Sequence, residues 1–113
     1  GVTWGDIGAA TFPPGSVTGA PKLAALAHIA RLETAPRGVY CGAVGWVDAD
    51  RRCGELNVAI RTFWAEHGRL HLGTGGGITW DSTPDGEWAE TELKARRLLA
   101  VASGAGLALP GRR

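Results

Sequence analysis

Methionine is absent from this chain of 113 residues, and the first residue is Gly1. Removal of an initiator methionine before glycine would explain that start, and so would a piece of a longer polypeptide. Metal-binding clusters are also missing, because His28, His67 and His71 have no ligand spacing with the two cysteines. The pattern argues against a zinc site.

A charge excess and a long apolar run are absent as well. Lysine and arginine number 12 against 11 acidic residues, so no basic field exists to hold a nucleic-acid backbone. No apolar run approaches the roughly 20 residues that span a bilayer, and no basic segment precedes an apolar one at the N-terminus. We therefore expect a cytoplasmic protein without nucleic-acid or membrane partners.

The hydrophobic content of 44% predicts one domain with a core, spanning residues 1–113, although the length is small for a whole metabolic enzyme. Residues 1–20 are rich in glycine, threonine and proline, which predicts an irregular lead-in and leaves a short strand over 4–11 open. A helix is predicted over 21–34, where apolar residues recur at helical spacing after Pro21. A second is predicted from a cap at Ser82 or Thr83 to about residue 102, ended by Gly104 and Gly106.

Between these helices, β-branched and aromatic residues predict three strands, over 39–47, 55–64 and 69–78. The loop 48–54 and the turn 66–68 join them into an antiparallel meander, so the expected fold class is α+β, with the meander flanked by helices. Facing residue numbers should sum to about 101 in the first hairpin and about 135 in the second. This register keeps Cys41 away from the turn that holds Cys53, so both cysteines are expected to be reduced thiols, with Cys41 packed.

The same register places Tyr40, Arg61 and Thr74 in one row across the three strands. A hydroxyl, a guanidinium and a glycine-lined backbone in a row make a plausible anion site. The alternative is a surface arginine beside a core tyrosine, and spacing alone favours that alternative.

A second candidate anion site is the segment 12–22, whose prolines and glycines form a rigid turn with few side chains. It exposes backbone amides beside the Ser16 hydroxyl and the Lys22 cation, and a hydroxyl at a helix start is more often a cap or an anion contact than a nucleophile. The segment is not a nucleotide P-loop, because Ala20 and Pro21 separate the last glycine from the lysine. The glycines of 73–77 lack dinucleotide-binding spacing and are expected to let a ligand approach the backbone.

Three charged residues of the C-terminal helix, Glu87, Glu90 and Lys94, form a stripe beside its apolar face. Two carboxylates one turn apart can hold a hard divalent cation, and a lysine one turn further on can meet a carboxylate of the ligand. The alternative is an exposed ion pair between Glu90 and Lys94, which is the commoner occurrence in helices.

Six blocks, in order along the chain, resemble the C-terminal part of the chorismate-utilising enzymes. This family includes the large subunits of anthranilate synthase and aminodeoxychorismate synthase, and the isochorismate and salicylate synthases. The resemblance is nearest to aminodeoxychorismate synthase component I (para-aminobenzoate synthase, in folate biosynthesis), with anthranilate synthase component I and isochorismate or salicylate synthase as alternatives. The blocks are 14–22, 37–45, 60–62, 73–78, 81–82 and 87–94.

The resemblance implies a C-terminal fragment of the chorismate-binding fold and a magnesium-dependent transferase or lyase reaction on chorismate. Glu90 would be a direct magnesium ligand and Glu87 a nearby or water-mediated one, while Lys94 would contact the substrate or the metal-bound carboxylate. The remaining expected contacts to substrate carboxylates are made by Tyr40, Arg61, Ser16 and the amides of Gly75 and Gly77. No catalytic residue is expected within this chain.

Family members are several times longer, and their N-terminal portion supplies a catalytic lysine, a histidine and another magnesium-binding glutamate. None of these is found here, so isolated catalysis is doubtful, and apolar surface exposed by the missing portion would favour a homo-oligomer. Expected partners are chorismate, that N-terminal portion and a glutamine amidotransferase subunit. Two interpretations stay open: half of an enzyme's active site, or a non-catalytic folded remnant.

Overall fold

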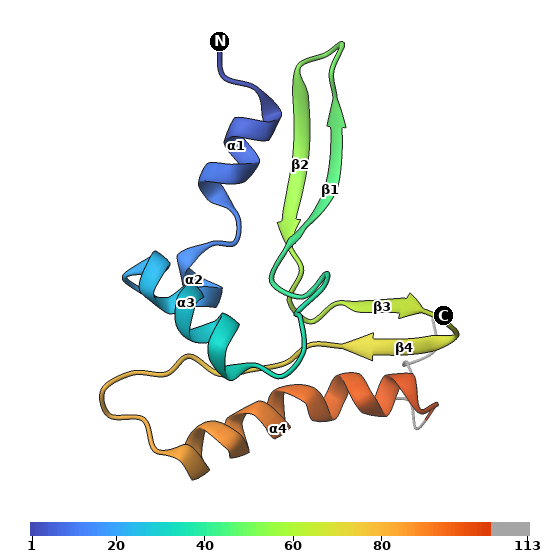
Figure 1. Cartoon of the computed structure of the whole chain (residues 1–113). Helices are drawn as coiled ribbons and strands as arrows, with labels where there is room; N and C mark the ends of the chain where they lie inside the picture. The colour runs from blue at the N-terminus through green and yellow to red at the C-terminus, as the bar shows by residue number, and fades with distance from the viewer. Residues whose placement is uncertain (105–113) are drawn as a thin grey trace, which may run out of the picture. The chain divides into compact units, whose positions relative to one another are not determined.

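The computed structural model describes residues 1–104 and contains two compact units, divided after Gly73. The first unit contains three helices and four strands, and the second contains the long helix α4 (Figure 1). Helices and antiparallel strand pairs confirm the α+β class. The single-domain interpretation stays a prediction. Among the described residues, no helix is both long and apolar enough to cross a membrane.

Helix α1 (Trp4–Thr11) replaces the irregular lead-in that the composition predicts. A capping box starts it: the Thr3 hydroxyl accepts from the Asp6 amide at 3.2 Å, and the Thr3 amide donates to the Asp6 carboxylate at 2.8 Å. These bonds to Thr3 lower the pKa of Asp6. The amides of Thr3 and Asp6 are thereby satisfied, which stabilises a helix in a segment whose glycine content gives it weak helix propensity. The irregular lead-in predicted from that glycine content was therefore wrong.

The two longer helices confirm the sequence-based expectation. Helix α3 (Lys22–Leu32) follows Pro21 at its N-cap, after the short turn of α2 (Gly15–Thr18). Helix α4 (Pro84–Ala102) has Thr83 as its N-cap and a proline in its first turn. Gly104 follows its end with φ 72°, the left-handed conformation that glycine adopts without strain. The other predicted stop, Gly106, lies outside the described residues.

The strands form two antiparallel hairpins with the predicted register. In the first, β1 (Ala43–Asp48) pairs with β2 (Cys53–Val58), and Ala43 faces Val58. In the second, β3 (Phe63–Glu66) pairs with β4 (Arg69–Leu72) around a two-residue turn, and Phe63 faces Leu72. Positive φ at both turn residues, His67 and Gly68, matches the twist of the flanking strands.

The three-stranded meander is wrong, because the strand predicted over 55–64 is interrupted and the hairpins form separate two-stranded sheets. The Ile60 amide turns back to the Val58 carbonyl at 2.8 Å, and Arg61 has φ 52°. Next to this break, the Cys41 amide donates to the Ala59 carbonyl, and the Ala59 amide donates to the Gly42 carbonyl. Cys41 and Gly42 therefore both face the single residue Ala59, which is a β-bulge. This bulge ends the ladder.

The expected row of Tyr40, Arg61 and Thr74 therefore has no continuous ladder to hold it. Tyr40 precedes the bulge, Arg61 lies in the break, and Thr74 follows the end of β4.

Burial within the described residues is limited to small side chains, Cys41, Ala59 and Ala95. Cys41 is 3% exposed and packed as expected, and both cysteines are free thiols. Among residues 1–104 no core of large side chains is formed, since many large apolar side chains stay exposed, among them Trp46, Trp80 and Trp88. Two-stranded hairpins have no second layer that could cover both faces.

Candidate functional site

Tyr40 is half-buried in the loop that leads into β1. Its ring lies so close to the Gly73 backbone that a Cβ on Gly73 would clash with it. Burial, more than the neighbouring Cys41, raises the pKa of Tyr40, and the nearby Arg37 cation partly opposes this rise. Tyr40 also helps line a cavity of about 410 Å³ within the first unit, whose walls include Phe12, Leu26 and Ile29.

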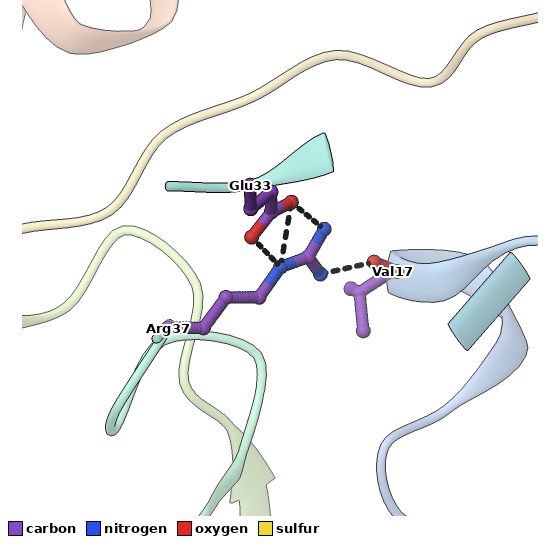
Figure 2. Close-up of polar contacts among 3 residues, drawn as sticks. All are labelled: Val17, Glu33 and Arg37. Atoms are coloured by element: carbon purple, nitrogen blue, oxygen red, sulfur yellow. Dashed lines mark hydrogen bonds and ion pairs between the residues drawn. The ribbon is translucent and has the colours of Figure 1, made fainter. Parts of the chain in front are cut away.

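Arg37 uses its whole guanidinium group in contacts within the first unit (Figure 2). Its Nε donates to both carboxylate oxygens of Glu33 at 3.0 and 3.1 Å, and its Nη2 donates to one of them at 2.6 Å. Its Nη1 donates to the Val17 carbonyl at 2.9 Å. These bonds lower the pKa of Glu33 and raise the pKa of Arg37, so the pair stays charged at neutral pH.

Ser16 lies exposed in α2, one residue before Val17. The N-cap of α2 is Pro14, so the alternative interpretation of Ser16 as a helix cap is wrong. The turn is held by bonds to the Pro14 carbonyl from the Val17 amide at 3.1 Å and the Thr18 hydroxyl at 3.0 Å. The Ser16 hydroxyl is therefore presented to solvent on a closed turn.

Arg61 is exposed in the break between β2 and β3. Over residues 1–104, no hydrogen bond or ion pair engages its guanidinium, in contrast to Arg37. The left-handed backbone at Arg61 is a strained conformation for a residue with a long side chain. Such strain is often found at binding sites, so Arg61 remains a candidate anion contact.

In the second unit, Glu87 is the most unusual polar group. Its Oε1 accepts a short hydrogen bond from the Ser82 hydroxyl. Its Oε2 is buried without a hydrogen-bond partner within the described part of the chain, and lies against Gly76, where a Cβ would clash with it. A buried carboxylate oxygen without a donor or a cation is costly.

Glu90 and Lys94 form the ion pair that helical spacing predicts, with Oε1 and Nζ 2.5 Å apart. Lys94 Nζ also donates to the Gly75 carbonyl at 3.4 Å, and the Thr74 hydroxyl donates to the Thr91 carbonyl at 3.3 Å. These bonds hold Thr74 and Gly75, at the start of the glycine-rich loop, beside α4. One oxygen from the loop and one from the helix thus contact the same cation, the ammonium of Lys94.

The predicted site residues therefore form two groups. Ser16, Tyr40 and Arg61 belong to the first unit, and Gly75, Gly77, Glu87, Glu90 and Lys94 belong to the second. The described residues contain no group of three or more histidine, cysteine or acidic side chains that could hold a metal. Sequence reasoning missed Ser82 as the partner of Glu87, although it identified Ser82 as a candidate helix cap. It also missed Arg37, whose only signal was its place four residues after Glu33.

The chain matches the model of the chorismate binding enzyme family over residues 1–100, and it belongs to this family. Curated relatives agree. The chain is 43% identical over 102 residues to anthranilate synthase component 1 of Neisseria meningitidis, which covers 90% of this chain and 21% of that protein. It is 44% identical over 103 residues to aminodeoxychorismate synthase of Streptomyces griseus, which covers 91% of this chain and 14% of that protein.

A third relative, anthranilate synthase component 1 of Saccharolobus solfataricus, is 46% identical over 89 residues, covering 79% of this chain and 21% of that protein. The chain thus spans about a fifth, or less, of the relatives it matches. Identities to the two kinds of enzyme lie close together, so they do not separate one family member from another.

Proposed function

We propose that this chain forms the C-terminal half-site of a magnesium-dependent, chorismate-converting enzyme. The observation that carries the proposal is the buried Oε2 of Glu87, which has no hydrogen-bond partner among residues 1–104 and lies on α4 one helical turn before Glu90. A carboxylate held by Ser82 but left with an unused oxygen is suited to bind a cation.

The donor set fits magnesium. Magnesium takes one or two protein carboxylates and usually keeps several waters, so Glu90 and Glu87 are sufficient, the second directly or through water. Bound there, the ion would offset the negative charge that develops as a hydroxyl leaves the ring. The Glu90 to Lys94 pair is partly exposed and worth only a few tenths of a kcal/mol, so Glu90 can exchange Lys94 for another cation.

Chorismate carries two carboxylates, and the chain offers donors of the right kind for them. Arg61 has a guanidinium fork that no hydrogen bond or ion pair among residues 1–104 engages, and Tyr40 supplies a hydroxyl. Ser16 and the amides of Gly75 and Gly77 would complete the contacts, with Lys94 as a second cation. The role of these residues is to bind and orient the substrate, which explains why no nucleophile is required among them.

Activity of the complete protein would need residues outside this chain, which spans only a fifth or less of its relatives. The proposed partners are the N-terminal portion of such an enzyme, which would supply the catalytic lysine, and a glutamine amidotransferase subunit as the ammonia source. Exposed apolar side chains such as Trp46 and Trp88 are available to pack against that portion.

For the particular reaction, we favour aminodeoxychorismate synthase component I, of the para-aminobenzoate and folate branch. The preference is based on two segments, 15–22 and 40–46, which look most like that type. Anthranilate synthase component I is the alternative, and relatives of both names match this chain equally well. Incubating the complete enzyme with chorismate and ammonia and identifying the aminated product would decide between them.

The metal site is tested by Glu90→Gln in the complete enzyme that contains this chain, with Glu92→Gln as the matched control on the same helix. We expect Glu90→Gln to reduce magnesium-dependent turnover about a hundredfold or more and to weaken magnesium binding measured by calorimetry. Glu92→Gln should change neither. Equal behaviour of the two variants would refute the assignment.

A further inference from the structure

The guanidinium group of Arg37 lies beside Tyr40, one of the proposed carboxylate-binding residues, yet its hydrogen-bonding capacity is directed at the protein. Three of its contacts go to Glu33 and one goes to the Val17 carbonyl (Figure 2). Its charge is balanced by Glu33 at 2.6 Å. An arginine paired in this way has little left to offer a substrate anion.

The contacts of Arg37 join three segments that are separate along the chain. Glu33 is the C-cap residue that follows α3, Val17 belongs to α2, and Arg37 itself precedes Tyr40 in the loop before β1. The Arg37 Cζ lies 5.8 Å from the centre of the Tyr40 ring, and the Tyr40 amide donates to the Arg37 carbonyl at 3.1 Å. One side chain thus fixes the turn of Ser16 and the loop of Tyr40 relative to each other.

We propose that the Arg37–Glu33 pair is a positioning clamp, which sets the places of Tyr40 and of the Ser16 turn without contacting the substrate. The functional meaning of the clamp rests on the proposed function, because that assigns Tyr40 and Ser16 to a carboxylate. The clamp itself is a statement about this chain alone and can be tested without chorismate.

The fork geometry is what a clamp requires. Lysine would keep the positive charge but could not bond Glu33 through two nitrogens while donating to Val17 with a third. Arg37→Lys therefore keeps the positive charge but removes the fork geometry on which positioning depends. If only the charge matters, lysine should suffice.

The first readout uses Cys41, which is buried next to Tyr40 and lines the same cavity. In a Cys53→Ser background, Cys41 is the remaining thiol, so its rate of reaction with an aromatic disulfide reagent reports opening of this loop. We expect Arg37→Lys to raise that rate about tenfold, because charge-assisted bonds to Glu33 and Val17 are lost. Arg51→Lys is the matched control, since Arg51 forms an exposed ion pair with Asp48 at 3.8 Å.

The second readout is the pKa of Tyr40, the single tyrosine of the chain, followed by tyrosinate absorbance. Burial is the main cause that raises this pKa, and the Arg37 charge lowers it. Loss of positioning with the charge retained, as in Arg37→Lys, should expose the ring and move the pKa down toward the usual tyrosine value. An electrostatic role alone predicts no change in Arg37→Lys and a further rise in Arg37→Gln.

Glu33→Gln provides a second variant if Arg37→Lys does not fold, as judged by circular dichroism. It keeps the Val17 bond, so a smaller acceleration of the Cys41 reaction is expected. Cys41 rates within about twofold of the parent in both variants, with an unshifted Tyr40 pKa, would overturn the clamp. That failure would leave the chorismate proposal standing, and failure of Arg61 or Glu90 variants to affect ligand binding would leave the clamp standing.

Discussion

Two pairs of charged residues in this molecule have the same sequence spacing and different surroundings. Glu33 and Arg37 are four residues apart, as are Glu90 and Lys94. Arg37 lies beyond the end of α3 and donates to a third partner, the Val17 carbonyl, at 2.9 Å, whereas Lys94 lies on the same helix face as Glu90 and donates to the Gly75 carbonyl at the longer distance of 3.4 Å. We propose that the first pair holds the local structure and that in the second pair Glu90 can exchange Lys94 for another cation.

Carboxylates show the same contrast. Both oxygens of Glu33 accept bonds from Arg37, while Glu87 has one oxygen bonded to Ser82 and one buried oxygen that no donor among residues 1–104 reaches. Charges satisfied within the protein build the local structure, and charges left unsatisfied mark where a ligand is needed. This difference is the basis for assigning positioning to the first region and cation binding to the second.

The largest effect on cation binding in the second region is expected from a substitution of Gly76, whose missing side chain leaves room for Glu87. We expect Gly76→Ala to displace the Glu87 carboxylate and to lower magnesium affinity ten- to a hundredfold, roughly the range for altered ligand support. Gly77→Ala is the matched change, because a Cβ there meets nothing within 4 Å. Calorimetric titration with magnesium should separate the two, and equal affinities would contradict the role of Glu87.

A smaller effect is expected at Arg61, the counterpart of Arg37 without internal partners among the described residues. Arg61→Lys keeps the charge but loses the fork, so chorismate affinity should fall about tenfold if the guanidinium binds a carboxylate bidentately. Arg69→Lys, an exposed change in β4, is the control for general charge effects. Unchanged affinity in Arg61→Lys would rule out this role.

The smallest effect concerns stability and pH. Bonds from Arg37 lower the pKa of Glu33, so the pair stabilises the fold fully above the usual glutamate pKa and loses that contribution as pH falls through the lowered value. Because both side chains are partly exposed, we expect less than about 1 kcal/mol. Urea unfolding at pH near 7 and near 3 should show a smaller acid-induced loss in Glu33→Gln than in the parent. An identical loss would show that the pair contributes nothing measurable.

Local patterns predicted much of the fold. Pro21 and Pro84 fix helix starts, and the two-residue turn at His67 and Gly68 fixes one register. The Glu90 to Lys94 pair followed from helical spacing alone. In each case a few neighbouring residues determine the outcome, so no knowledge of distant segments was needed.

Features that depend on several segments were not predictable. The ladder ends because Cys41 and Gly42 both face Ala59, and neither strand alone shows that bulge. Arg37 binds Val17, 20 residues away, and Gly76 makes room for Glu87 from a loop outside α4. Helix α1 was missed for a different reason, since its signal was local but Asp6 stands where a capping box usually has Glu or Gln.

The central claim, the proposed half-site for chorismate that depends on magnesium, is tested most directly by calorimetric titration of this chain with chorismate, with and without magnesium. The account predicts binding that appears only with magnesium and disappears in Glu87→Gln. Absence of binding from a chain shown to be folded, or binding that ignores magnesium, would contradict it.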